Sequence, residues 1–168
     1  MIPIVNPWGW VHDIRDNKAG IGINRDWPTF KARETEILRQ ILKNKTYDLM
    51  VDLHEDPTAR GFYLIQYGLD DSSVGEKIVA AVEDMGYPIE QDVSLVTLKT
   101  VNGIIDAPMW GLWYMRLTGQ LSITNYYRLN NSRFVYAIET PTILMWEDRL
   151  KIQITAVAML LEHYTGDK

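Results

Sequence analysis

The chain has no cysteine among its 168 residues, so disulfide bonds, thiolate catalysis and cysteine-based zinc sites are excluded. It has no block of basic residues either, because 17 lysines and arginines stand against 22 aspartates and glutamates, for a formal net charge of −5. We therefore expect no nucleic acid partner and no attraction to an anionic membrane surface. His12, His54 and His163 are the only imidazoles available to bind a metal.

Long apolar runs are also missing. None approaches the roughly 20 residues that cross a bilayer, so we expect no membrane-spanning segment. The first ten residues, MIPIVNPWGW, lack the basic region of a signal peptide and soon reach Pro7 and Gly9. On this basis the compartment stays open, with the cytoplasm favoured.

Apolar patterns of two kinds alternate along the chain. Strand-like runs that are apolar on both faces alternate with runs at helical spacing. This alternation predicts one α/β domain over residues 1–168, with a central mixed, mostly parallel sheet flanked by helices. The expected strands cover residues 2–5, 48–54, 62–66 and 133–140, and the expected helices cover residues 30–44, 73–86 and 146–163.

More detail can be predicted for one loop and for the last helix. Residues 6–28 are rich in Gly, Asn, Asp, Pro and Trp, and predict a long irregular loop that its three tryptophans keep ordered. The last helix carries Leu150, Ile154, Val157 and Leu161 on one face.

Polar residues that suit chemistry stand at the ends of two apolar strands and in the tryptophan-rich loop. His54 and Glu139 end strands, where an imidazole suits a metal ligand or general base and a carboxylate with apolar neighbours suits proton transfer. Arg15 and the pair Asn24-Arg25 lie in the loop, and guanidinium groups match the two oxygens of a carboxylate or a developing oxyanion. Together these residues suit hydrolysis of an acyl or peptide bond beside a free carboxylate.

Simpler interpretations remain open for each residue. His54 suits a hydrogen-bonded structural role, and Glu139 suits a plain strand end before Thr140-Pro141. Arg15 and Arg25 suit exposed ion pairs with the aspartates of the same loop, which is the common fate of such charges; these aspartates are Asp13, Asp16 and Asp26.

Five segments in a fixed order resemble the zinc carboxypeptidase superfamily, which includes the carboxypeptidases and the aspartoacylase and succinylglutamate desuccinylase-like deacylases. They are NPWG, the Arg15-x-Asn17 pair, GIGINRDW, DLHE and IETPT, and they run from Pro3 to about Pro141. The resemblance implies an α/β fold with a central mixed sheet, a zinc cofactor, and a peptide or acyl-amino acid substrate with a free carboxylate.

Carried over to matching positions, the resemblance implies a role for each candidate. His54 resembles the third zinc ligand, and Glu139 the glutamate that moves protons between water and the leaving amine. Arg15 resembles the arginine that stabilises the oxyanion, and Asn24 and Arg25 resemble the pair that binds the terminal carboxylate. A tyrosine that closes over the substrate is expected at Tyr126 or Tyr127.

The chain departs from the family in one respect, because it has no His-x-x-Glu motif, the family's source of the first two zinc ligands. Three explanations compete: the chain is the C-terminal portion of a longer enzyme, a non-catalytic relative, or a partner of a chain that donates the ligands. We favour the first, in which the N-terminal strands are absent and an exposed sheet edge favours a homo-oligomer. The predicted function is a zinc metallocarboxypeptidase, with an N-acyl amino acid deacylase or a carboxylate-binding assembly module as alternatives.

Overall fold

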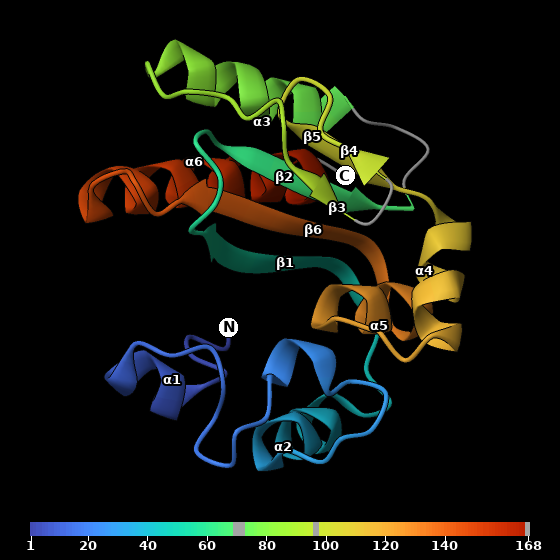
Figure 1. Cartoon of the computed structure of the whole chain (residues 1–168). Helices are drawn as coiled ribbons and strands as arrows, with labels where there is room; N and C mark the ends of the chain where they lie inside the picture. Colours follow the sequence, from blue (N-terminus) through green and yellow to red (C-terminus); the bar gives the residue numbers. More distant parts are fainter. Residues whose placement is uncertain (69–72, 96–97, 167–168) are drawn as a thin grey trace.

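The computed structural model describes residues 1–68, 73–95 and 98–166. Strands and helices alternate along most of the chain, and the longer strands form one central sheet (Figure 1). The helices are α1 (Pro7–His12), α2 (Arg33–Leu42), α3 (Ser73–Asp84), α4 (Met109–Leu117), α5 (Ile123–Asn130) and α6 (Trp146–Thr165), with a short 3₁₀ helix η1 (Ile23–Arg25). The strands are β1 (Tyr47–Asp56), β2 (Tyr63–Tyr67), β3 (Ser94–Leu95), β4 (Leu98–Lys99), β5 (Ile104–Ala107) and β6 (Ser132–Pro141).

The central sheet has four strands in the order β1-β6-β2-β5. β1 pairs with β6 and β2 pairs with β5 in parallel, whereas β2 and β6 are antiparallel. The predicted mixed, mostly parallel sheet flanked by helices is therefore confirmed. The register places His54 beside Glu139 on β6, and Tyr63 of β2 beside Glu139 on its other side.

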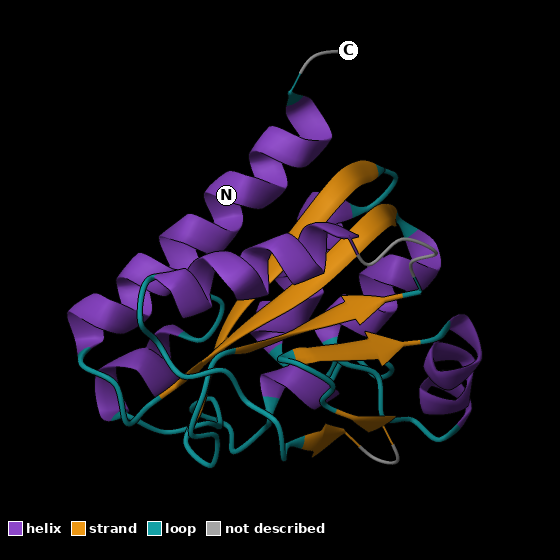
Figure 2. Cartoon of the chain, turned by 90° about the horizontal axis from the view of Figure 1, so that it is seen from above, coloured by secondary structure: helices purple, strands orange, loops and turns teal. Residues whose placement is uncertain are grey.

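Both faces of the sheet are covered. On one face, α3 and α6 pack over β2 and β6 in a core that includes Ile78, Ile138 and Ile152. In Figure 1 α6 runs behind the sheet, and in Figure 2 it is the long helix that leads to the C-terminus. On the other face, alternate strand residues such as Ile65 and Val135 pack with Leu112 of α4. Chemistry-bearing strand residues on this second face are thus separated from α6 by the sheet.

The N-terminal third forms a smaller core beside β1. Trp27 is fully buried and packs with Leu38 of α2 and with Leu121 and Tyr127 at α5. α5 also contacts β1, β2 and β6, so it joins this core to the sheet. Figure 1 shows α1 and α2 on the β1 side of the sheet. This arrangement brings the loop residues that precede Trp27 to the sheet.

The predicted strand at residues 2–5 is wrong. Within the described residues no strand pairs with this segment, and Ile2 and Ile4 are 44% and 41% exposed. An extended apolar segment becomes a strand only where another strand supplies hydrogen-bond partners. The outer edge of β1 is likewise unpaired within the described part of the chain, since β1 is the first strand in the sheet order. Association of two copies over this edge stays a prediction.

The predicted bounds of the other strands agree with the structure more closely than those of the N-terminal loop and helix. The predicted irregular loop 6–28 contains α1 and η1, because Asn6 caps α1 by accepting a hydrogen bond from Gly9 N at 3.0 Å. Helix 30–44 is shorter than predicted, because Phe30 has φ of 51° and Asn44 has φ of 62°, outside the helical region. The strands 48–54, 62–66 and 133–140 and the helices 73–86 and 146–163 correspond to β1, β2, β6, α3 and α6.

The face of α6 that packs on the sheet differs from the predicted stripe. Ile152, Ala156 and Leu160 are fully buried, whereas Leu150, Ile154 and Leu161 are exposed. The spacing of large aliphatic residues favoured the wrong stripe, because the buried one carries a small alanine at its centre. A small residue lets a helix approach a sheet closely, and only the packed structure reveals which stripe has that fit.

Candidate functional site

Strand register assembles the candidate site on the face opposite α6. Side chains two residues apart on a strand share one face, so Asp52, His54 and Asp56 of β1 lie on the same side. Glu139 pairs with His54 across the parallel β1–β6 ladder, and Tyr63 pairs with Glu139 from β2. A polar group of side chains is therefore held on three neighbouring strands.

His54 donates a hydrogen bond from Nε2 to Asp52 Oδ2 at 2.9 Å. The amide nitrogen Nδ2 of Asn24 lies 3.2 Å from the same Nε2, and it can donate to this nitrogen only when Nε2 carries no proton. Burial alone would lower the pKa of His54, but the Asp52 hydrogen bond and the charges of Asp52 and Glu139 raise it to about 9. At neutral pH His54 is therefore an imidazolium held against Asp52.

Glu139 is half-buried, as are the other carboxyl groups of the site, Asp52 and Asp56. Burial raises its pKa to about 7, the charges of Asp56 and Asp52 raise it as well, and His54 and Arg15 oppose them. A carboxyl group whose pKa lies near neutral pH can both accept and return a proton. The raised pKa of Glu139 is compatible with proton transfer near neutral pH, and its catalytic role stays a prediction.

Asn24 joins the loop to the sheet and to α5. Its Nδ2 contacts His54, and its Oδ1 accepts a hydrogen bond from Ile123 N at 3.0 Å. Arg25 Nη1 donates to the backbone oxygen of Asn24 at 2.9 Å. These contacts bring three distant parts of the chain together beside Glu139.

Arg15 and Arg25 do not form the ion pairs of the simpler interpretation. Within residues 1–68, 73–95 and 98–166, neither guanidinium pairs with a carboxylate. Asp26 instead accepts hydrogen bonds from Thr29, Lys31, Ala32 and Thr35. Burial and the nearby charge of Arg15 both lower the pKa of Arg25. Two neighbouring cations without an acidic partner form a site that suits an anion.

The structure places Tyr126 and Tyr127 in a different cluster. Both rings lie about the buried Trp27, with centroids 5.5 Å and 5.4 Å from it, and Tyr126 also packs edge-on against Phe30. Among the described residues neither tyrosine has a hydrogen bond to His54 or Glu139. The proposed substrate-closing role of Tyr126 or Tyr127 stays a prediction, and this structure gives both rings a packing role.

Three further residues of the site had no assigned role from the sequence. Asp52 holds His54, and Asp56 accepts a hydrogen bond from Tyr63 Oη at 2.8 Å. The two aspartates share the spacing of two with His54 in VDLHED, which puts all three on one strand face and was the available signal. Tyr63 could not be found this way, because it reaches the site through the antiparallel pairing of β2 with β6.

The residues present do not by themselves fit a metal ion. A catalytic zinc needs three protein ligands, and within the described ranges no three His, Cys, Asp or Glu side chains are grouped as ligands. His54 adds a second difficulty, since an imidazolium has no free lone pair and must lose a proton before it binds a metal. The zinc-ligand role of His54 stays a prediction that requires ligands from elsewhere.

No helix in the described part of the chain has the length and apolar content of a membrane span. Comparison with protein-family models finds no match, and comparison with curated protein sequences finds none either.

Solved structures share the fold. A protein from Shewanella denitrificans has a TM-score of 0.80 at 18% identity, covering 97% of this chain and 60% of its own. A protein from Shewanella amazonensis has a TM-score of 0.77 at 18% identity, and one from Shewanella baltica has a TM-score of 0.78 at 20% identity. Each match covers 96% of this chain and 62% of the other chain. All three bear the name "putative metallopeptidase". At this identity the likeness shows the α/β fold, and the chain spans about 60% of the length of those proteins.

Proposed function

We propose that this chain is part of a hydrolase of the metallopeptidase kind that acts on a peptide or acyl-amino acid with a free carboxylate. One observation carries the proposal: a glutamate with a pKa of about 7 lies beside His54 and near Arg15, whose guanidinium is close to that of Arg25. The names of the three Shewanella proteins of the same fold support the reaction class. The finer assignment that we propose is a zinc carboxypeptidase.

The chain's own residues supply substrate binding and proton transfer in this proposal. Arg25, positioned by its bond to the Asn24 backbone, binds the carboxylate of the substrate, and Arg15 stabilises the oxyanion of the tetrahedral intermediate. Glu139 accepts a proton from the attacking water and returns it to the leaving amine. Asp52 fixes the orientation of His54 by accepting a hydrogen bond from its Nε2.

A metal would need ligands beyond those described. We propose that a second segment or a second chain supplies them, and that this chain is the C-terminal portion of the whole catalytic domain. The coverage of about 60% of the Shewanella proteins supports this assignment. The chain purified alone should then hold far less than one equivalent of zinc after dialysis, because His54 alone is a weak ligand. Elemental analysis measures this, with a His54→Ala variant as control. Stoichiometric zinc in the wild-type chain alone would contradict it.

Arg25→Ala should weaken binding of a carboxylate ligand. A hydrogen bond to a charged group contributes about 1.5–3 kcal/mol, so the dissociation constant should rise about 10- to 100-fold. In a hydrolysis assay the loss should appear as a higher KM. Arg33→Ala is the matched control, because Arg33 is exposed at the start of α2 and has no ion pair among the described residues. Equal effects of the two variants would argue against a carboxylate site at Arg25.

Two alternative functions keep the same residues. An N-acyl amino acid deacylase would use the same carboxylate site, and a panel of C-terminal peptides against N-acyl amino acids separates the two enzymes. A non-catalytic carboxylate-binding module is favoured by one observation, the lack of a metal-ligand group among the described residues. That module would bind carboxylates through Arg25 but release no product from either panel.

A further inference from the structure

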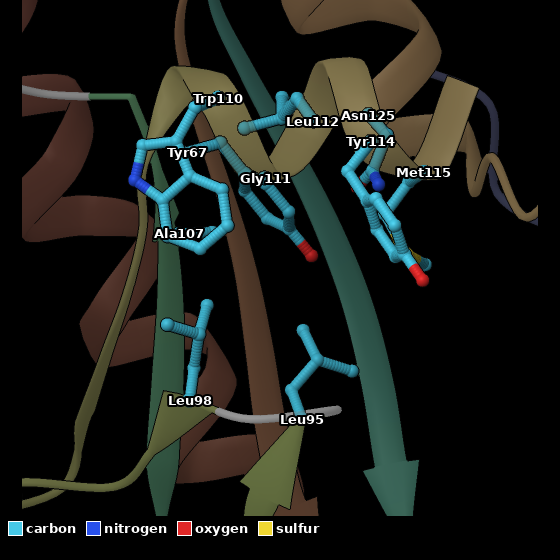
Figure 3. Close-up of a pocket in the computed structure, with 10 residues that line it drawn as sticks. All are labelled: Tyr67, Leu95, Leu98, Ala107, Trp110, Gly111, Leu112, Tyr114, Met115 and Asn125. Atoms are coloured by element: carbon cyan, nitrogen blue, oxygen red, sulfur yellow. The ribbon is translucent and has the colours of Figure 1, made fainter. Parts of the chain in front are cut away.

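An apolar cavity lies on the same face of the sheet as the candidate site, near the ends of β2 and β5. Its volume is about 230 Å³, and its walls come from β2, β5, α4, α5 and the short β3–β4 pair. Figure 3 shows the Tyr67 ring between Trp110 and Tyr114 of α4, facing Leu95 and Leu98. The cavity is therefore bounded by aromatic and aliphatic side chains on several sides.

The size of the cavity suits a small apolar group. A cavity of about 150 Å³ with apolar walls binds benzene, so by proportion this one accommodates roughly nine non-hydrogen atoms. Its mouth carries large aromatic rings that stay in water, since Trp110 and Tyr114 are 66% and 55% exposed. An apolar ligand would cover part of these rings and remove that apolar surface from water.

One polar donor lies in the wall without a partner. Asn125 is only 6% exposed and lines the cavity. Its Oδ1 accepts a hydrogen bond from Ser122 Oγ at 2.8 Å, whereas its Nδ2 donates to no acceptor among the described residues. In Figure 3 the amide nitrogen of Asn125 lies beside the Tyr114 ring. An amide N–H group in a cavity wall that has no protein acceptor can donate to an acceptor on a ligand.

Tyr67 separates this cavity from the candidate site. Its ring is buried in the cavity wall, and its side chain is hydrogen-bonded to Thr124 of α5. It also lies close enough to Arg25 for the guanidinium charge to act on the pKa of the Tyr67 hydroxyl. Arg25, His54 and Glu139 do not line the cavity. The cavity is thus a neighbour of the carboxylate site and not part of it.

We propose that this cavity binds an apolar group of about nine or ten non-hydrogen atoms that carries one hydrogen-bond acceptor, placed to accept from Asn125 Nδ2. The inference is independent of the hydrolase proposal, because binding is measured without turnover. The two proposals can therefore fail separately.

The test uses a matched pair of bicyclic probes, 1-indanone with one carbonyl acceptor and indane with none. Equilibrium dialysis with the full chain should show saturable binding of both probes, with 1-indanone binding at least about five times more tightly because of its extra hydrogen bond. Asn125→Ala should remove the preference for 1-indanone. Trp110→Ala should raise the dissociation constants of both probes about tenfold, because it removes one wall of the cavity.

Two controls separate this cavity from other surfaces. Trp113→Ala removes an exposed tryptophan of the same helix that does not line the cavity, and it should leave both affinities within about twofold. Arg33→Ala removes an exposed cation at the start of α2 and should also leave 1-indanone binding unchanged. Circular dichroism establishes that each variant is folded. Binding that is not saturable, or that falls equally in Trp113→Ala and Trp110→Ala, overturns the proposal.

Discussion

Glu139→Gln is expected to lower kcat about 100- to 10,000-fold, the usual contribution of a positioned general acid–base group. Glutamine fills the same space beside His54 but cannot accept a proton, so the binding of a carboxylate ligand should change little. The measurement is the hydrolysis rate of the preferred peptide or acyl amino acid, with the ligand dissociation constant determined separately. A large loss of rate with intact binding separates proton transfer from substrate positioning.

Glu55→Gln is the matched control for that result. Glu55 follows His54 directly but lies on the opposite face of β1, where it pairs with Arg149 at 2.5 Å. The variant should weaken this ion pair and leave kcat within about threefold, since the pair is partly exposed and remote from the reacting groups. If Glu139→Gln retained most of the wild-type kcat, Glu139 would not be the proton-transfer residue.

Asp26→Ala is expected to lower the free energy of unfolding by about 3 kcal/mol, because it removes the acceptor of buried and half-buried donors. One carboxylate oxygen accepts from Thr29 Oγ1 and Lys31 N, and the other from Ala32 N and Thr35 Oγ1, at 2.5–3.0 Å. These bonds fix the turn between Arg25 and α2. Loss of these hydrogen bonds in Asp26→Ala should therefore also weaken carboxylate binding at Arg25, although we assign Asp26 no contact with the ligand.

The same carboxylate predicts a pH dependence of stability. Burial would raise the pKa of Asp26, but the hydrogen bonds from Thr29, Thr35 and the backbone lower it below its ordinary value. A group with a lowered pKa in the folded state stabilises the fold above its unfolded pKa, near 4, and loses this contribution as pH falls through the folded pKa. The stability difference between wild type and Asp26→Asn should be constant at neutral pH and shrink in acid.

Urea unfolding at several pH values measures both effects. Glu83→Gln is the control, since Glu83 is exposed on α3 and its side chain has no hydrogen bond among the described residues. It should change the unfolding free energy by less than about 0.5 kcal/mol at every pH. A difference between wild type and Asp26→Asn that grew as pH fell would contradict the assigned sign.

Local sequence patterns determined several elements and the polar ends of two strands. β1 and β6 follow from continuous apolar runs, and α6 follows from a long helical period that starts just after a proline-containing turn. His54 and Glu139 stand out because polar residues at the ends of apolar runs are visible in one dimension. The two residues are neighbours because β1 and β6 pair in parallel, and the strand order and register that bring them together are features of the folded sheet.

The tertiary structure decided the features that depend on contacts between distant residues. Asn24 reaches Ile123, 99 positions away, and Tyr63 reaches the site only because β2 runs antiparallel to β6. Residues 2–5 pair with no strand in the described part of the chain, so their apolar character does not make them a strand. The buried stripe of α6 centres on Ala156, and the apolar cavity exists because Tyr67 and α4 enclose it.

The physical reason for this division is the range of the forces involved. Backbone preference and apolar periodicity act within a few residues, so the sequence displays them directly. Pairing, close packing and shifted pKa values depend on which distant groups share a small volume, and many arrangements satisfy the same local pattern. The sequence by itself therefore determined the polar strand ends of this protein, and only the fold brought Asn24, Arg25, His54 and Glu139 into one site.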